Sequence, residues 1–224
     1  MSKTKKTEKK PEKVVEAQAS PENTKDALIL AATRLFATVG YDKTTVKDIS
    51  ERAGVNVSLV SYHFQGKENL YRAVLEQFGT ARLSVAERIL VSPSSTEEFK
   101  VRLKMMVEEM FYFMTQNIDL CSIVQREVES GLPVAKDVFK NTFLKIFEKL
   151  NQFIAAAKKE KIVRADVDPF VAASVVHGCI MHLSKMDHIA KEVYGVTLQD
   201  ESHRKKVVEQ LVEFYMNGLL RDKV

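Results

Sequence analysis

The segment that most constrains the fold is residues 45–64, which has the pattern of two short helices joined by a tight turn. Thr45 stands three residues before Asp48, the spacing of a capping box, in which each side chain accepts a backbone N–H at the start of a helix. Apolar residues recur at helical spacing around Ile49 until Gly54, whose permissive backbone can end the helix. A helix beginning at Thr45 and a turn at Gly54 are therefore predicted.

The second helix of the pair follows this turn, with Asn56 as its candidate cap. Val60 and Phe64 are four residues apart, so they share a buried face. The outer face then carries Val57, Ser58, Ser61 and Tyr62. Two helices joined by a short glycine-containing turn form the arrangement that places a second, recognition helix in the major groove of DNA.

Several short motifs resemble, in order and spacing, the DNA-binding domain of the TetR/AcrR family of bacterial transcriptional regulators. They are Gly40-Tyr41, Thr44–Ile49, Ala53–Val55, Tyr62–Phe64 and Lys67-Glu68. The resemblance covers about residues 24–72. It implies an N-terminal helix-turn-helix domain, and a C-terminal helical domain that holds a small-molecule pocket and forms a homodimer through its last two helices.

The candidate DNA contacts lie on the helix pair and at the start of the helix after it. They are Thr45, Lys47, Asn56, Val57, Ser58, Ser61, Tyr62, His63 and Lys67. The recognition helix lacks Arg and Lys, so we expect specificity from thymine methyl contacts, hydroxyls and DNA shape. Tyr62 and His63 match family positions that touch the phosphate backbone, although His63 could instead brace the turn that follows.

The charge distribution gives little support to DNA binding through bulk charge. The chain has 224 residues and a formal net charge of +4, and residues 1–20 hold six lysines against three glutamates. Residues 21–70 hold equal numbers of cationic and anionic side chains. Residues 1–20 also hold almost no large apolar side chains, which predicts a disordered basic tail. This tail either adds DNA contacts or is simply solvated.

The rest of the chain predicts further helices and no strands, so the fold class is all-α. Besides the helix pair, helices are expected at residues 23–39, 67–90, 99–117, 119–130, 135–159, 168–193 and 201–220. Residues 91–96 form a loop, with Pro93 as breaker and Thr96 as the next cap. Three regions are predicted: the tail at 1–20, the helix-turn-helix domain at 21–70, and a regulatory, effector-binding and dimerisation domain at 71–224.

The C-terminal region offers candidates for both roles that the resemblance implies. The effector-pocket candidates are Met106, Met110, Phe113, Met114, Arg126 and His177, and methionine is common at adaptable surfaces. The dimer candidates are Val175, Cys179, Leu183, Val208, Leu211, Val212 and Tyr215. In both sets, apolar residues at helical spacing could instead be internal core.

Other classes of site find no support in the sequence. Cys121 and Cys179 lie far apart and form neither a disulfide framework nor a zinc pattern. His177 and His182 are five residues apart, too far around a helix to share one metal ion. There is no nucleophile elbow or glycine-rich phosphate loop. We therefore expect no enzyme, no metal and no cofactor. Without a long apolar run we also expect no membrane partner and a cytoplasmic protein, held at the nucleoid when bound to DNA.

The function predicted is a dimeric regulator of transcription, a repressor released from a palindromic double-stranded DNA operator by an unknown small-molecule effector. Linkage then requires that DNA weaken effector binding by the same factor. The alternative is a protein that coats DNA for nucleoid organisation or division control with the same fold. The number of sites per genome would separate the two.

Overall fold

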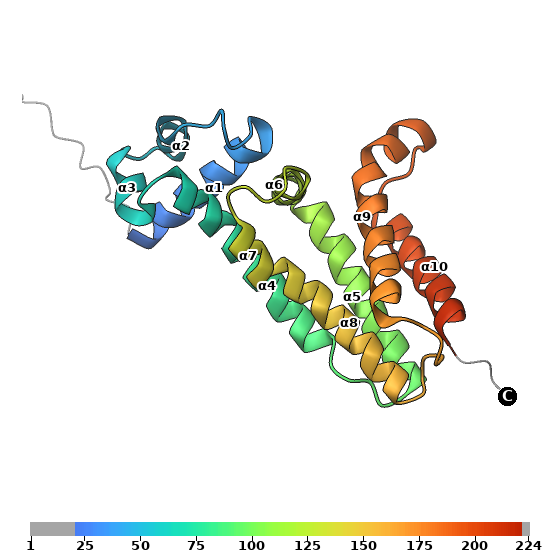
Figure 1. Ribbon diagram of the computed structural model, residues 1–224. Coiled ribbons are helices and arrows are strands. Elements are labelled where there is room, and N and C mark those ends of the chain that lie inside the picture. Colours follow the sequence, from blue (N-terminus) through green and yellow to red (C-terminus); the bar gives the residue numbers. More distant parts are fainter. Residues whose placement is uncertain (1–20, 221–224) are drawn as a thin grey trace, which may run out of the picture.

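The computed structural model describes residues 21–220, which form an elongated assembly of helices (Figure 1). The helices are α1 Pro21–Thr38, α2 Val46–Ala53, α3 Ser58–Phe64, α4 Lys67–Ile89, α5 Thr96–Gln116, α6 Ile118–Glu129, α7 Lys136–Asn141, α8 Phe143–Lys159, α9 Pro169–Tyr194 and α10 Glu201–Leu219. The all-α prediction is confirmed. The tail predicted at 1–20 lies outside the described residues. Within the described range, no helix is long and apolar enough to cross a membrane.

The helix pair predicted from the capping box is present as α2 and α3. Thr45 Oγ1 accepts from Asp48 N at 3.1 Å, and Thr45 N donates to Asp48 Oδ2 at 2.9 Å. Gly54 ends α2 in the left-handed conformation with φ 68°, a backbone geometry that glycine adopts without strain. These local signals, rather than tertiary contacts, therefore set the bounds of α2.

The N-terminal helices do not form a core by themselves. Residues of α1, α2, α3 and the first half of α4 are buried in one cluster with Ile123 of α6, Ala135 in the loop before α7, and Val138 of α7. The predicted boundary between residues 70 and 71 falls inside α4, a single helix of 23 residues that reaches from this cluster into the C-terminal bundle (Figure 1). The two regions consequently share both a helix and a core.

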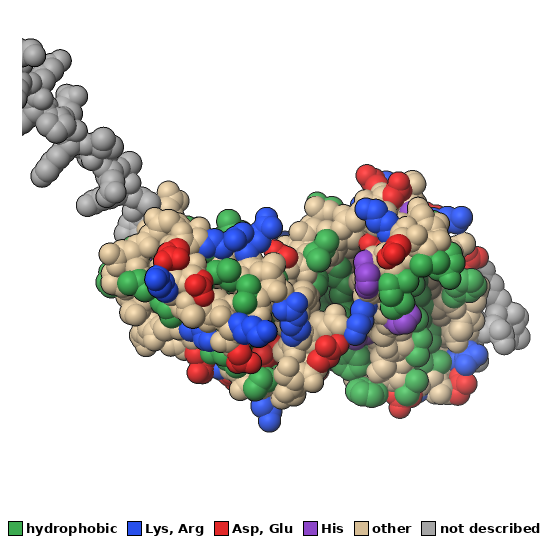
Figure 2. Space-filling model, turned by 90° about the horizontal axis from the view of Figure 1, so that it is seen from above, with side chains coloured by type: hydrophobic (Ala, Val, Ile, Leu, Met, Phe, Trp, Pro, Cys, Tyr) green, Lys and Arg blue, Asp and Glu red, His purple; other side chains and the backbone are tan. Residues whose placement is uncertain are grey.

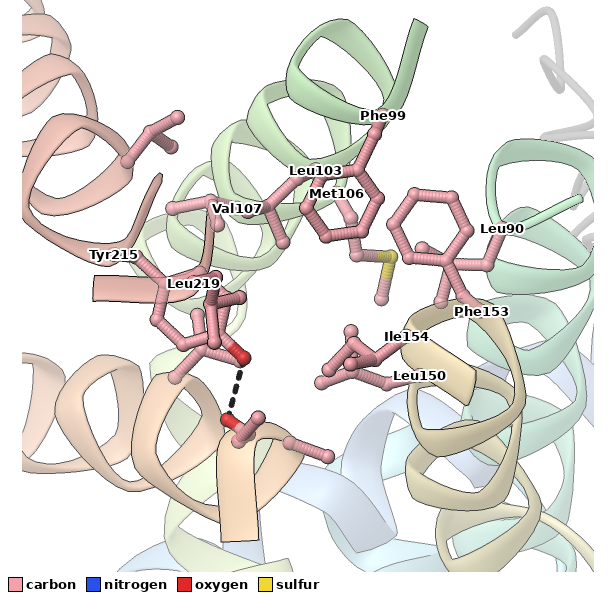
Figure 3. Packing of buried hydrophobic residues seen from close by; sticks show 14 of the residues in the cluster. Leu90, Phe99, Leu103, Met106, Val107, Leu150, Phe153, Ile154, Tyr215 and Leu219 are labelled. Carbon is pink, nitrogen blue, oxygen red and sulfur yellow. Dashed lines mark hydrogen bonds between the residues drawn. The ribbon is translucent and has the colours of Figure 1, made fainter. Parts of the chain in front are cut away.

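The second core joins α5, α8, α9 and α10 (Figure 3). Phe99 of α5 and Phe153 of α8 stack with ring centroids 4.9 Å apart. Tyr215 of α10 donates its hydroxyl to the carbonyl of Ala172 on α9 at 2.6 Å. This bond satisfies the polar end of a buried side chain, so α10 is fixed against the bundle by both apolar and polar contacts.

Two boundary predictions are wrong in the C-terminal region. The single helix expected at 135–159 is divided into α7 and α8 at Thr142, whose ψ is −75° and whose hydroxyl donates to the carbonyl of Val138 at 2.7 Å. Thr142 also lies against α4 at Gly79, where the methyl group of an alanine would come within 2.4 Å of the threonine hydroxyl oxygen. The cap of α5 is Ser95, not Thr96, because the Ser95 hydroxyl accepts from Glu98 N at 3.1 Å.

Candidate nucleic-acid interface and interior cavity

The outer face of α3 is exposed, while its inner face is fixed in the N-terminal core. Val60 is fully buried and Phe64 is 6% exposed, whereas Val57 is 50% and Tyr62 78% exposed. Ser58 and Ser61 are exposed beside them. The two buried residues therefore settle which side chains point outward, and an apolar, hydroxyl-bearing surface faces the solvent.

Asn56 and Thr45 are engaged at the starts of the two helices. The Asn56 side-chain oxygen accepts from Ser58 N at 2.9 Å and from the Ser58 hydroxyl at 2.8 Å. Val57, rather than Asn56, occupies the cap position of α3 and makes no side-chain capping bond. The Thr45 hydroxyl donates to Asp48 Oδ2 at 2.7 Å, and this bond leads the causes that lower the pKa of Asp48. Both helix starts are thus rigid and exposed.

Three further predicted DNA contacts lie at this end of the molecule in different surroundings. Lys47 is exposed, with its ammonium 3.7 Å from Glu51. The His63 ring is half-buried and meets the Tyr62 ring edge-on at a centroid distance of 4.9 Å. Lys67 donates to the carbonyl of Tyr41 at 3.0 Å and lies 4.3 Å from the centre of its ring. Lys67 therefore fastens the turn before α2 to the start of α4.

The C-terminal bundle holds a cavity of about 500 Å³ that is partly open to solvent. Side chains of α4, α5, α6, α7, α8 and α9 line it, most of them apolar. Figure 2 shows a hollow between α6 and α9 that is lined by hydrophobic side chains and edged by histidine and charged side chains. The volume and apolar lining are those of a binding site for a small organic molecule.

The structure brings together five of the six predicted pocket residues: Met106, Met110, Phe113, Met114 and His177. Arg126 lies elsewhere. It is exposed, and its guanidinium donates to the carbonyl of Phe36 at 3.3 Å, at the C-terminal end of α1. Its position on α6 turns it away from the cavity and toward the N-terminal helices.

Arg82 is a cavity residue that the sequence pattern did not single out. Its guanidinium lies 4.3 Å from the centre of the Phe113 ring, and its Nη1 is 3.8 Å from Glu109 Oε2. Its Nε is buried and has no hydrogen-bond partner among the described residues. Helical spacing could have indicated Arg82 as a cavity residue, because it stands four residues after Phe78 and three before Val85 on one face of α4.

Burial governs the protonation of two other cavity groups. It lowers the pKa of His177, which keeps this imidazole neutral near neutral pH. It raises the pKa of the Cys121 thiol to about 11, so that the thiol stays protonated. Neither side chain therefore supplies a charge to the cavity, and no group of three potential metal ligands is found within residues 21–220.

Helix α6 lies between the cavity and the N-terminal helices. Cys121, Val124 and Val128 face the cavity. Glu127 points the other way and is 5% exposed, with its Oε2 accepting from the Tyr71 hydroxyl of α4 at 2.9 Å. A ligand that displaced α6 would consequently disturb a buried contact with α4, the helix that directly follows α3.

The predicted dimer surface needs correction at three positions on α10. Val208, Val212 and Tyr215 are 1%, 2% and 8% exposed, because they pack α10 onto the rest of the chain. Leu211 is half-buried and packs against the edge of the same core. Phe214, which was not predicted, is 75% exposed on the outer side of α10.

The exposed apolar surface continues on α9. There Val175 is 52% and Leu183 39% exposed, with the half-buried Cys179 between them. Val171, one turn before Val175, is 57% exposed. Apolar side chains thus remain uncovered on both of the last two helices.

The N-terminal part of the chain is similar to a known family of proteins. Residues 28–74 match the family described as bacterial regulatory proteins, tetR family. The HTH-type transcriptional regulator RutR of Escherichia coli strain K12 is 26% identical over 198 residues, which cover 87% of this chain and 90% of RutR. The similarity to RutR therefore extends well beyond the helix-turn-helix.

Solved structures extend the likeness to the whole fold. The regulator FadR from Bacillus subtilis, in complex with stearoyl-CoA, aligns with a TM-score of 0.70 and 15% identity, over 86% of this chain and 98% of FadR. The ketosteroid transcriptional regulator KstR2 of Mycobacterium tuberculosis gives a TM-score of 0.68 and 18% identity, over 88% and 95% of the two chains. At this identity the comparison establishes a shared fold.

Proposed function

We propose that the chain is a tetR-family bacterial regulatory protein, the family whose model matches residues 28–74, and that it represses transcription as a homodimer bound to a two-fold symmetric DNA operator. Each protomer places α3 in the major groove. Val57, Ser58, Ser61 and Tyr62 face the bases and the backbone, while Thr45, Lys47, Asn56 and His63 contact neighbouring phosphates or brace the helices that do. Lys67 acts indirectly, by holding the turn at Tyr41.

The observation that carries this proposal is the contrast between the two faces of α3. Its inner face is fixed by Val60 and Phe64, and its outer face is exposed but poor in hydrogen-bond donors. Such a helix can read thymine methyl groups and groove shape. It binds effectively only when a partner helix occupies the matching position one or more helical turns away, so dimer geometry controls affinity.

A small organic effector supplies that control. The cavity lies next to α6, and α6 contacts the N-terminal helices through Glu127 and Arg126. A fold relative solved with stearoyl-CoA supports the use of this fold for holding an organic ligand. An effector that prefers a displaced α6 would favour a spacing of the α3 helices that no longer matches the operator. No catalytic step forms part of this proposal.

Selection of genomic fragments by the purified protein tests the proposal. We expect a few discrete sites, each with two-fold symmetry and half-sites separated by whole helical turns. A parallel selection with Tyr62→Ala should recover these sites poorly. Recovery of very many unrelated fragments would favour a DNA-coating protein, and recovery of none would contradict both functions.

A further inference from the structure

Arg82 has an unusual position for a charged side chain. It lies in the wall of an apolar cavity, its guanidinium rests on the Phe113 ring, and its Nε is buried without a partner among residues 21–220. Its ion pair with Glu109 is long, at 3.8 Å, which exceeds hydrogen-bond distance. A buried donor without an acceptor is destabilising, so an acceptor supplied by a ligand would be favoured here.

The other cavity groups do not offer a comparable positive charge. Lys185 is 57% exposed and lies 3.0 Å from Glu129, which also accepts from Gln125 at 2.9 Å. His177 is buried and holds its proton less readily than a free histidine. Of the lysine and arginine side chains among the described lining residues, Arg82 is therefore the less exposed, with 27% of its side chain accessible.

The remaining wall is suited to an apolar body. Phe78 lies 4.7 Å from Phe113 and 5.5 Å from Phe143, measured between ring centroids, and Phe139 stacks on Phe143 at 5.1 Å. Methionines of α5 complete this surface. Such rings and flexible thioethers accept aliphatic or aromatic ligands without specific polar contacts.

We propose, building on the function proposed above, that the effector is an apolar organic acid whose carboxylate accepts hydrogen bonds from Arg82. Its hydrocarbon or aromatic body lies against the phenylalanine and methionine side chains. The guanidinium presents Nε and Nη donors in a fork that matches a carboxylate. Glu109 is 46% exposed, so water screens its repulsion of the bound acid.

Matched pairs of probes test the charge of the ligand directly. Dodecanoate is compared with dodecanol, and diphenylacetate with diphenylethanol, by titration calorimetry on the full-length protein. A hydrogen bond to a charged group contributes about 1.5–3 kcal/mol, so the better-fitting acid should bind at least about tenfold more tightly than its alcohol. The Arg82→Gln variant should lose this preference while its alcohol affinity stays within about twofold.

Two further variants make the comparison specific. Arg88→Gln removes an exposed cation from the same helix and should leave the preference for the acid intact. Arg82→Lys should keep part of the preference, because it retains the charge but loses the fork. Thermal unfolding of each variant checks that the fold is preserved, and Arg82→Lys provides the test if Arg82→Gln does not fold.

Three results would overturn the proposal: alcohols binding as tightly as acids, binding of neither kind of probe, or loss of the preference in Lys185→Gln but not in Arg82→Gln. The function proposed above fails separately. If alcohols release DNA from the selected sites as well as acids do, the regulator stands and the organic acid is wrong. If acids bind through Arg82 but no genomic site is recovered, the organic acid stands and the regulator is wrong.

Discussion

At the scale of single residues, the contact between Tyr71 and Glu127 joins the N-terminal helices to the bundle. The Tyr71 hydroxyl donates to Glu127 Oε2, while Glu127 Oε1 accepts from the backbone N–H groups of Val134 and Ala135 at 3.0 and 2.8 Å. Burial, followed by the hydrogen bond to Glu127, raises the pKa of Tyr71 well above its usual range. The hydroxyl therefore remains a donor at any ordinary pH.

Replacing Tyr71 with Phe should lower the free energy of unfolding by about 1–3 kcal/mol, because one oxygen of a buried carboxylate loses its donor. Urea unfolding monitored by circular dichroism measures the change. The matched control is Tyr62→Phe, at a site that is 78% exposed, which should alter stability by less than about 0.5 kcal/mol. Equal stability of Tyr71→Phe and the native protein would show that this contact does not stabilise the fold.

His177 makes a pH-dependent contribution to stability. The ordinary pKa of a histidine is 6.5, and burial lowers the pKa of His177 below this value in the folded chain. Below pH 6.5 the unfolded chain therefore binds the proton more readily than the folded chain does. The free energy of unfolding therefore falls as the pH decreases through this window. His177→Gln should reduce the loss of stability between about pH 7.5 and about pH 5.5, measured by urea unfolding. An unchanged loss in the variant would assign the acid sensitivity to other groups.

The outer face of α3 was predictable from sequence, whereas the surroundings of Lys67 and Arg82 were not. Val60 and Phe64 share a helical face, and local spacing alone settles which residues they leave outside. Lys67 instead binds the carbonyl of Tyr41, 26 residues earlier in the chain. The burial of Arg82 likewise depends on Phe113 of α5, and sequence periodicity does not report such pairings.

At the scale of helices, the crossing of α4 with the α7–α8 junction is the tightest approach seen at a glycine. A methyl group on Gly79 would lie 2.4 Å from Thr142 Oγ1 and 2.6 Å from its Cβ. Gly79→Ala should therefore lower the free energy of unfolding by about 1–3 kcal/mol, despite the better helix propensity of alanine. Chemical unfolding measures this change.

The control for Gly79→Ala is Thr80→Ala, on the exposed side of the same helix. This change should be neutral or stabilise by a few tenths of a kcal/mol, since alanine is the better helix former. A Gly79→Ala variant as stable as Thr80→Ala would mean that α4 and Thr142 can separate at little cost.

The division of α7 from α8 could not be predicted, although both helices could. Apolar residues keep helical spacing through Thr142, so a continuous helix was expected. The break follows from tertiary contacts, because Thr142 packs on Gly79 while its hydroxyl bonds to Val138. In contrast, α2 was predicted correctly, since its capping box and its glycine act within the segment.

At the scale of the whole molecule, the exposed apolar residues of α9 and α10 define the proposed dimer surface. Phe214→Glu would place a charge on the most exposed apolar side chain of α10 and should give monomers by light scattering at micromolar concentration. The same variant should bind operator DNA weakly, because two α3 helices are needed. Val101→Glu is the control, since Val101 is 57% exposed on α5 and lies outside this surface.

A dimer that persists in Phe214→Glu while Val101→Glu dissociates would relocate the interface to α5. The sequence analysis placed the dimer surface on these two helices, which stays a prediction, but its candidates Val208, Val212 and Tyr215 lie on the face of α10 that is buried within the chain. Helix α10 has one wide apolar face, and periodicity alone does not tell whether such a face packs within the chain or against a partner. The packing of α10 against α5 and α9 shows that this face lies inside the chain.

The most direct test of DNA reading by α3 is hydroxyl-radical footprinting of a selected genomic fragment. The native protein should protect two segments, related by two-fold symmetry and separated by whole helical turns. Tyr62→Ala should abolish both protected segments at the same protein concentration, whereas Val101→Glu should preserve them. Continuous protection along the fragment, or protection that survives Tyr62→Ala unchanged, would contradict the assignment of α3 as the DNA-reading helix.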